Sequence, residues 1–238
     1  DAALFTCTIS ATQYVLAFTA AEDYDDPDDA DDDNDYLVTV TINDGVNGGA
    51  TISYTVTVDD TNDQTPTYSA TDTTPSVAEG ATAVETNIAI TDTDTGDVNA
   101  CTLAGADKDV FTCTVSATVY TLAFTNAEDY DVPDDANDDN DYLVTVTIND
   151  GTNGGATISY TVTVDDTNDQ TPTYSSSDTT PNVDEGDTAV ETVAITDTDT
   201  GDVNVCTLAG NDAALFTCTI SATQYVLAFT AGEDYEDP

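Results

Sequence analysis

The chain has 238 residues and a formal net charge of −47, because 48 Asp and Glu residues face one Lys, no Arg and no His. This composition excludes nucleic-acid binding, since nothing could neutralise the phosphates, and it excludes electrostatic attraction to anionic lipid. So many like charges repel one another in a folded chain, so the acids must either stay solvated or hold cations. Many of them recur in fixed short motifs, which favours cations.

The sequence repeats itself. Residues 1–27 return at 212–238 with two changes, and a looser copy occupies residues 107–133. Phe111 recurs as Phe216, a step of 105 residues, which is the size of a domain rather than of a solenoid repeat. The chain begins and ends at the same phase, as a segment cut from a longer array would. We therefore expect the later part of one repeat at 1–66, a complete repeat at 67–172 and the first part of the next at 173–238.

Alternation of apolar and polar residues predicts β-strands throughout. In the first partial repeat it occurs at Tyr14–Phe18, Tyr36–Ile42 and Ile52–Val58, which are rich in Val, Ile, Thr and Tyr. Period-two alternation of this composition is typical of half-buried strands, and no stretch shows a convincing helical period. In the complete repeat the expected strands are Ser76–Val77, Glu85–Ile90, Ala100–Leu103, Val110–Val115, Val119–Phe124, Asp141–Ile148 and Thr157–Val164.

The turns and linkers between these strands indicate the architecture. Asn149-Asp-Gly151 and Asn153-Gly-Gly155 are turn signals that make the last two strands a hairpin with a long loop. About seven short strands in a unit of this size predict an all-β, Greek-key, immunoglobulin-like β-sandwich. The linkers 60–66 and 166–172 are short, end in Pro and contain no Gly/Ser spacer. We therefore expect tandem sandwiches joined end to end.

Cysteine spacing predicts two disulfides. Cys101 and Cys113 are twelve residues apart, as are Cys206 and Cys218, and each pair flanks a short loop between strand-like segments. We expect both pairs to be bonded, each contributing roughly 3 kcal/mol; buried free thiols are the alternative. Cys7 corresponds to Cys113, and its partner would precede residue 1. Together with the lack of a membrane-spanning run, the cysteines favour an extracellular setting.

Four acidic motifs recur at a fixed phase. In the complete repeat they are Ser76-Val-Ala-Glu-Gly80, Asp92-Thr-Asp94, Glu128-Asp-Tyr-Asp131 and the linker Asp166-Thr-Asn-Asp-Gln-Thr-Pro172. Acids at i and i+2 in an extended turn can direct both carboxylates to one point, and Asn and backbone carbonyls can complete an all-oxygen shell. Such a shell, without His or Cys, is typical of calcium, and Mg²⁺ tolerates a large flexible cage less well.

At these motifs the chain resembles the cadherin extracellular repeat. In that family an early Glu, a DxD after the second strand, a DxE-type motif, a DxNDNxP linker and an Asp before a late Gly bind calcium between successive domains. The corresponding residues occur here in that order: Glu79; Asp92 and Asp94; Asp129 and Asp131; the linkers Asp60–Pro66 and Asp166–Pro172; and Asp150. The resemblance spans the whole repeat and implies cadherin-like sandwiches. One departure is that the second linker Asn of the family is Gln64 or Gln170 here.

The resemblance also implies two sets of calcium ligands. The first junction would use Asp23, Asp25, the linker residues Thr61, Asn62, Asp63 and Gln64, and then Glu79, Asp92, Asp94, Asn99 and Asp150. The second junction would use Asp129, Asp131, Thr167, Asn168, Asp169, Gln170, Glu185, Asp197, Asp199 and Asn204. Junctions with repeats beyond this segment would use Asp44, Asp234 and Glu236.

The acid-rich stretch Asp25–Asp35 exceeds what a junction needs. We interpret it as a solvated acidic loop, which is the usual state of a run of like charges. An additional calcium site in this loop is the alternative.

The sequence thus predicts an extracellular structural or adhesive fibre or stalk, built from tandem repeats that calcium makes rigid at their junctions. Its partners would be neighbouring copies of the same repeat, in one long chain or a filament. The alternative is an adhesion module that binds a cell-surface protein or glycan, or that self-associates homophilically. Catalysis is not expected, since His and Arg are absent, Lys108 has no counterpart in the other copies, and the paired carboxylates repeat as ligands would.

Overall fold

The computed structural model describes residues 1–69, 72–96, 99–116, 118–175, 178–201, 203–221, 223–234 and 236. Contacts between segments divide the chain into two compact units. The first unit consists of Asp1–Thr73, Glu85–Ala123 and Leu143–Tyr160. The second consists of Thr74–Val84, Phe124–Tyr142 and Thr161–Pro238.

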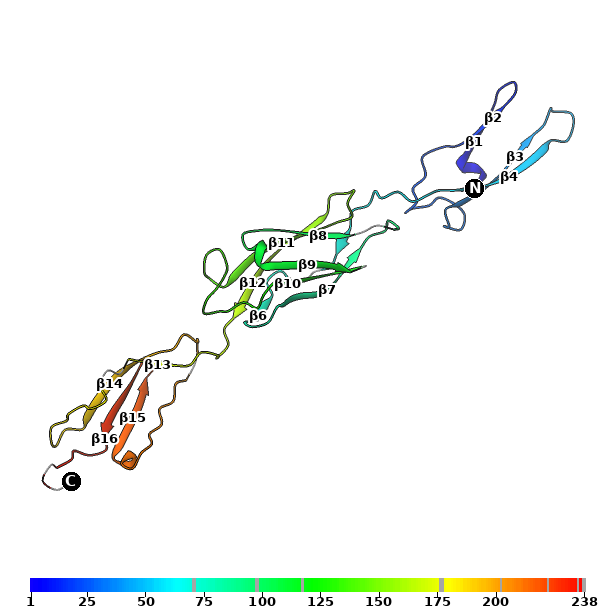
Figure 1. The fold of residues 1–238 in the computed structure, drawn as a ribbon. Helices are drawn as coiled ribbons and strands as arrows, with labels where there is room; N and C mark the ends of the chain where they lie inside the picture. Colours follow the sequence, from blue (N-terminus) through cyan, green and yellow to red (C-terminus); the bar gives the residue numbers. More distant parts are fainter. Residues whose placement is uncertain are drawn as a thin grey trace. The chain divides into compact units, whose positions relative to one another are not determined.

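The secondary structure is almost entirely β, as the alternation predicts (Figure 1). The described residues include three single-turn 3₁₀ helices, η1 (Ala2–Leu4), η2 (Lys108–Val110) and η3 (Ala213–Leu215). No helix in the described part of the chain is long and apolar enough to cross a membrane. The strands are β1 (Phe5–Ile9), β2 (Tyr14–Phe18), β3 (Asp35–Ile42), β4 (Ala50–Thr57), β5 (Thr67–Tyr68), β6 (Ser76–Ala78), β7 (Ala83–Thr91), β8 (Ala100–Ala104), β9 (Phe111–Ser116), β10 (Val119–Phe124), β11 (Asp141–Asn149), β12 (Ala156–Asp165), β13 (Thr173–Tyr174), β14 (Ala189–Thr196), β15 (Phe216–Ser221) and β16 (Gln224–Phe229).

All seven strands expected between residues 67 and 172 are present, as β6 to β12. Two details differ from the expectation. Val110 ends the 3₁₀ turn η2 instead of starting a strand, and the two-residue strand β5 was not predicted. Strand β5 pairs with β7, with Thr67 opposite Thr91 and Tyr68 opposite Ile90. Two residues are too few to display a period, so only the pairing partner reveals this strand.

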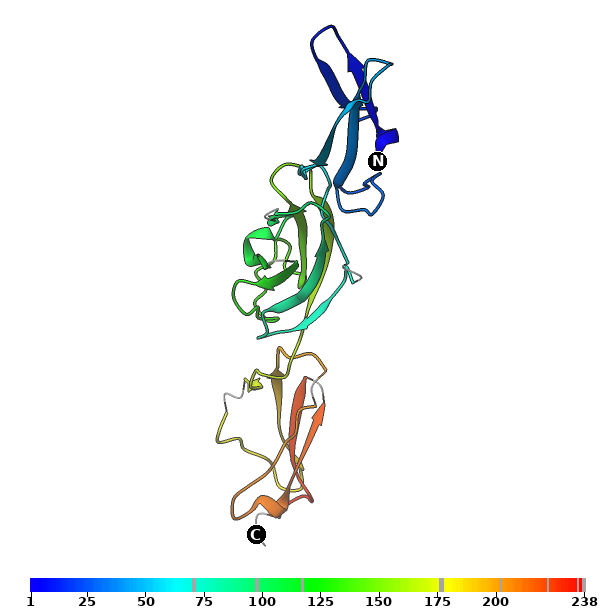
Figure 2. The same ribbon diagram turned by 90° about the vertical axis from the view of Figure 1, so that its right-hand side faces the viewer.

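The first unit contains antiparallel pairs. Strands β1 and β2 pair along their whole length, and so do β3 and β4, which run alongside each other in blue in Figure 2. The sheet with strand order β5-β7-β10-β9 lies mostly in this unit. Strand β11 pairs with β8 here, so that Ile148 lies opposite Cys101.

The core of the first unit follows from the alternation in β10 and β11. Tyr120, Leu122, Val146 and Ile148 are fully buried, with polar neighbours between them in the sequence. Burying each such side chain contributes about 1.5–3 kcal/mol. The hydroxyl groups of Tyr120 and Tyr160 hydrogen-bond to each other at 2.6 Å, which satisfies two polar groups inside the core.

The second unit has its own pairings and core. Strand β6 runs parallel to the end of β12, with Val77 opposite Val164, and the sheet β13-β14-β16-β15 is antiparallel. The rings of Phe124 and Tyr142 meet edge to face with centroids 5.1 Å apart. Aromatic pairs prefer this edge-to-face geometry. Val193, on β14, is also buried in this unit.

Both expected disulfides are present, and the Cα atoms of each pair are 6.1 Å apart. Cys101 lies on β8 and Cys113 on β9, which are the end strands of two different sheets. The bond therefore joins these sheets covalently. Cys7, on β1, is exposed.

Candidate metal centre

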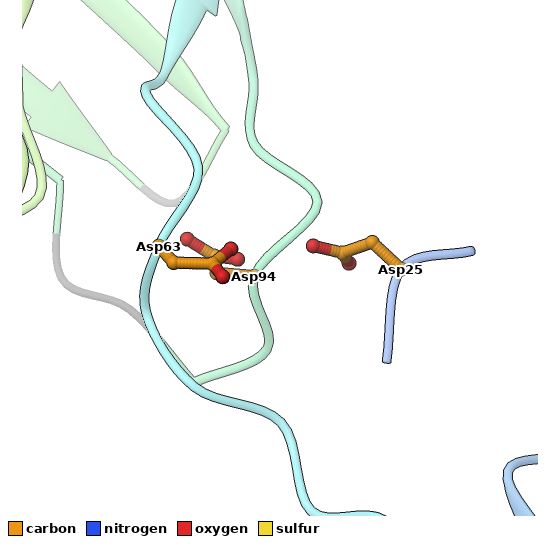
Figure 3. A group of neighbouring side chains, drawn as sticks. All are labelled: Asp25, Asp63 and Asp94. Carbon is orange, nitrogen blue, oxygen red and sulfur yellow. The ribbon is translucent and has the colours of Figure 1, made fainter. Parts of the chain in front are cut away.

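Three carboxylates from distant parts of the sequence meet in the first unit. Asp25, Asp63 and Asp94 each offer one oxygen atom, and these oxygens all lie within 4.8 Å of one another. Figure 3 shows Asp63 and Asp94 close together, with Asp25 directed toward them from a separate segment. Asp63 lies in the linker that follows β4, and Asp94 lies in the turn that follows β7. The structure therefore brings residues of the DxD and linker motifs together.

Backbone amides hold this cluster in place. The amide of Gln64 donates to Asp94 Oδ2 at 2.9 Å, which ties the linker to the turn after β7. The amide of Asp25 donates to Asp23 Oδ1 at 3.0 Å, so the two acids of that motif share one turn. The side-chain amide of Gln64 also donates to Asp63 Oδ1, at 2.9 Å.

The cluster is electrostatically unfavourable by itself. Burial, followed by the nearby charges of Asp94 and Asp60, raises the pKa of the Asp25 carboxyl. The one salt bridge in the described part of the chain joins Lys108 to Asp109 and leaves these acids unpaired with any cation. A bound cation would relieve the repulsion.

Buried oxygen atoms in the same unit point to a hard cation. Among the described residues, Asp94 Oδ1, Asp60 Oδ1 and Asn99 Oδ1 are buried and have no hydrogen-bond partner. Buried polar atoms are almost always satisfied, so each such oxygen needs an explanation. Calcium takes oxygen ligands only, from carboxylates, amides and carbonyls, and this donor set fits that chemistry.

A turn after β11 clamps the linker. The side-chain amide of Asn153 donates to Asn62 Oδ1 at 2.6 Å and to the Gln64 carbonyl at 2.8 Å. Asp150 Oδ1 accepts the amides of Thr152 at 2.7 Å and Asn153 at 2.8 Å. Burial raises the pKa of Asp150, but the hydrogen bonds from Asn153 and Thr152 outweigh it and lower the pKa below the ordinary value. Asp150 thus reaches the linker through Asn153.

The second unit contains the same arrangement. Asp131, Asp169 and Asp199 offer oxygens within 4.8 Å of one another, and the Gln170 amide donates to Asp199 Oδ2 at 3.0 Å. Burial, followed by the nearby acids Asp166, Asp129 and Glu79, raises the pKa of Asp131, although a hydrogen bond with Thr198 lowers it. Three oxygens are buried without a hydrogen-bond partner within the described ranges: Asp131 Oδ2, Asp166 Oδ1 and Asp197 Oδ1.

Glu79 lies with the second set of ligands, although the resemblance assigned it to the first. Its Oε2 accepts the amide of Tyr130 at 2.8 Å, and its Oε1 accepts the Thr167 amide and hydroxyl, both at 2.7 Å. The hydrogen bond from Thr167 is the main reason that its pKa is lowered. The cause of the placement is the parallel pairing of β6 with β12, which brings Glu79 to the linker that follows β12.

Glu185, the equivalent of Glu79 in the next repeat, follows the same rule. It was assigned to the second junction, but it lines a hollow with Gly186, Gly232, Glu233, Asp234 and Glu236. The amide of Gly186 donates to the Glu233 carbonyl at 2.9 Å. Each early Glu therefore lies beside the DxE-type motif of its own repeat.

The remaining expected ligands lie in several settings. Asp129 Oδ1 accepts the Asp131 amide at 3.0 Å, and Asp44 forms an exposed turn. Asn204 lines a hollow with Pro172 and Thr173. Partly buried residues are Asn62, Asp92 and Asp197, and exposed residues are Thr61, Thr167, Asn168 and Gln170.

Sequence reasoning missed two kinds of residue. The first Asp of each linker, Asp60 or Asp166, was not counted as a ligand, yet Asp60 accepts the hydroxyl of Thr95 at 2.6 Å and Asp166 accepts the amide of Thr200. Their recurrence at the head of both linker motifs was the available signal. The sequence predicts Asn153 only as part of a turn, and its local sequence contains no signal for the contact with the linker.

Solved structures are similar to this chain over most of its length. The structure of PcdhgB3 EC1-4 matches with a TM-score of 0.67 and 20% identity, covering 98% of this chain and 56% of that one. The protocadherin gammaB7 EC3-6 cis-dimer structure gives 0.61 and 19%, with the same coverage. Human CDH23 EC21-23 gives 0.57 and 22%, covering 85% of this chain and 66% of that one.

No protein-family model matches this chain, and no curated protein matches it. The chain spans a little over half the length of the first solved chains it matches, 56% in each case. At these identities the likeness is one of fold. The chain has the cadherin-like β-sandwich fold that the acidic motifs predict.

Proposed function

We propose that this chain is part of an extracellular tandem array, a fibre or stalk, in which calcium bound at the linkers makes successive repeats rigid. One observation carries the proposal: the cluster Asp25, Asp63 and Asp94 recurs as Asp131, Asp169 and Asp199. The recurrence at one phase of the repeat is what a junction site requires.

The residues suited to hold calcium in the first unit are the three clustered acids, together with Asp60 and the unpaired oxygen of Asn99. The equivalent set in the second unit adds Asp166 and Asp197 to the cluster there. When bound, calcium would supply positive charge and would make shared ligands of carboxylates that otherwise repel.

The protein's own residues prepare each site before a cation binds. Gln64 positions Asp94, and Asn153 fixes the linker, so the carboxylates are held together at an electrostatic cost. Extracellular calcium modules have Kd values of roughly 10⁻⁴–10⁻³ M, so each independent site adds about 0.4–1.4 kcal/mol at millimolar calcium. Rigidity would therefore depend on several coupled ions at each junction.

Extracellular location and a structural or adhesive role, rather than catalysis, are supported by the disulfides and by the cadherin-like fold. One similar solved structure is of a protocadherin cis-dimer, which favours self-association of repeats as the second candidate function. The matches favour neighbouring copies of the repeat over a glycan as partner.

Calcium binding by the 238-residue chain, measured by equilibrium dialysis with Mg²⁺ as competitor, tests the proposal. We expect saturable binding of at least two calcium ions that is retained against Mg²⁺. The double variant Asp94→Asn/Asp199→Asn should lose the junction ions, because it changes the most buried acid of each cluster. The matched control is Asp44→Asn, in an exposed turn, which should bind as the wild type does.

Small-angle X-ray scattering tests whether bound calcium makes successive repeats rigid. Chelation should broaden the distribution of maximum dimensions in the wild-type chain and leave the double variant unchanged. Unaltered binding in Asp94→Asn/Asp199→Asn, or equal scattering with and without calcium, would contradict the proposal.

A further inference from the structure

A third group of acids lies outside both junction clusters. Asp29, Asp31 and Asp33 each offer an oxygen, and these oxygens lie within 4.8 Å of one another. They belong to the loop between β2 and β3 in the first unit. Asp29 is buried, whereas Asp31 and Asp33 are exposed, so the group opens to solvent on one side.

Two buried side chains of this loop carry oxygens that point to a ligand. Asp29 is 6% exposed and Asn34 is 8% exposed. Asp29 Oδ2 accepts the Asp33 amide at 3.1 Å, and Asn34 Nδ2 donates to the Tyr24 carbonyl at 3.0 Å. The remaining polar atom of each side chain, Asp29 Oδ1 or Asn34 Oδ1, is buried without a hydrogen-bond partner in the described part of the chain. A buried carboxylate oxygen is costly to leave in this state.

The loop is held by contacts that do not use these oxygens. Asp1 Oδ1 accepts the Ala30 amide at 3.0 Å, and Asp1 Oδ2 accepts the Leu37 amide at 2.7 Å. The amide of Asp28 donates to the hydroxyl of Tyr36, at 3.3 Å. The acids are therefore brought together by the fold rather than by a cation, which reduces the ordering cost of binding one.

In the equivalent loop of the next repeat both oxygens of the buried Asp have hydrogen-bond partners, although Asn140 Oδ1, like Asn34 Oδ1, is buried without one in the described part of the chain. Asp135 Oδ2 accepts the amides of Asn137 and Asp139, both at 3.1 Å, and Asp135 Oδ1 accepts the Asn140 amide at 3.2 Å. Asn137 stands where the first loop has Asp31, and its side-chain amide donates to Asp139 Oδ2 at 2.6 Å. Here an amide replaces the third carboxylate, and both oxygens of the buried Asp have partners.

We propose that Asp29, Asp31, Asp33 and the Asn34 side-chain carbonyl form a calcium site within the repeat, separate from the junctions, and that Asn137 removes this site from the following repeat. An all-oxygen donor set with three carboxylates fits a hard divalent cation, and it favours calcium because Mg²⁺ usually binds through one or two carboxylates. The site would fix the β2–β3 loop rather than link repeats, so it does not depend on the proposed function.

Exchanging one residue between the two loops tests this proposal. In the 238-residue chain, Asp31→Asn copies the second loop into the first, and Asn137→Asp does the reverse. By isothermal titration with calcium, Asp31→Asn should bind one ion fewer than the wild type, or bind that ion at least tenfold more weakly. Asn137→Asp should gain one ion. Because both positions are exposed, we expect folding to be unaffected, and circular dichroism without calcium checks this.

A background without junction binding separates the two proposals. In Asp94→Asn/Asp199→Asn, calcium should still shift the amide NMR signals of residues 29–34, and the further change Asp31→Asn should abolish those shifts. Isotherms for Asp31→Asn and Asn137→Asp that equal the wild type, together with unshifted signals at 29–34, would overturn the loop site. Neither result depends on whether the junction clusters bind calcium.

Discussion

Two turns of nearly identical sequence behave differently in this protein. In Asp44–Asn47 and Asp150–Asn153, the Asp Oδ1 accepts the amide of the Asn three residues on, at 2.8 Å in both cases. In the first turn, Asn47 Nδ2 returns to Asp44 Oδ2 at 2.9 Å. In the second, Asn153 Nδ2 keeps a longer contact of 3.3 Å with Asp150 Oδ2 and also donates to Asn62 and Gln64 of the linker, at 2.6 Å and 2.8 Å.

The local sequence is therefore sufficient to form the turn, but only the surrounding structure makes the turn part of a site. Asp150 is 8% exposed, whereas Asp44 is exposed. Hydrogen bonds from Asn47 and Val46 lower the pKa of Asp44 to about 2. A glycine ends each loop at the equivalent position. A Cβ at Gly49 would collide with the carbonyl of Ile42, and a Cβ at Gly155 would collide with the carbonyl of Ile148.

Calcium removal should have the largest effect, and it should affect the two turns differently. For two sites with Kd near 10⁻⁴ M, chelating millimolar calcium costs about 3 kcal/mol of unfolding free energy. The backbone amide of Asn153 should then exchange its hydrogen faster, because the linker that the Asn153 side chain contacts is no longer fixed. The backbone amide of Asn47 should exchange as before. Thermal unfolding and hydrogen exchange, each with and without chelator, measure the two effects. Equal acceleration at both turns would contradict the role of the Asp150 turn.

Replacing each of the two Asn residues by Ala should reduce the stability of the protein by different amounts. Asn153→Ala leaves the oxygens of Asn62 and Gln64 without their donor and should lower the unfolding free energy by about 1–2 kcal/mol. Its matched control is Asn47→Ala, in an exposed turn, which should cost no more than about 0.5 kcal/mol. Urea unfolding of both variants measures the two losses of unfolding free energy. Comparable losses would mean that the contact with the linker contributes nothing to stability.

The smallest expected effect is on pH dependence without calcium. The pKa of Asp25 is raised, chiefly by burial, so the folded state binds this proton more tightly than the unfolded state. Removing the charge with Asp25→Asn should therefore stabilise the calcium-free protein at pH 7, and this gain should shrink as the pH falls through the raised pKa.

Asp44→Asn should have the opposite sign. With a folded pKa of about 2, the Asp44 carboxylate stabilises the fold above its unfolded pKa, and that contribution is lost as the pH falls toward 2. Thermal unfolding of both variants between pH 7 and pH 2 checks the two signs. A pH-independent difference from the wild type in either variant would contradict the assignment.

Much of the fold could be predicted because its signals are local. The alternation in β10 to β12 and the turn residues between them locate these strands to within a few residues. The DxD and linker motifs likewise indicated Asp63 and Asp94. What failed depends on long-range pairing. The placement of Glu79 follows from β6 lying parallel to β12, 87 residues apart at Val77 and Val164, and no local pattern encodes that contact.

The disulfide between β8 and β9 has a mechanical consequence. Cys101 and Cys113 close a loop with a sequence separation of 12 residues. When the chain is stretched from its ends, the residues inside this loop stay outside the line of force while the bond is intact. At 3.3–3.6 Å per residue, roughly 40 Å of contour is withheld from extension. The redox state of one cysteine pair per repeat would thus set how far such an array can lengthen before its backbone is fully taut.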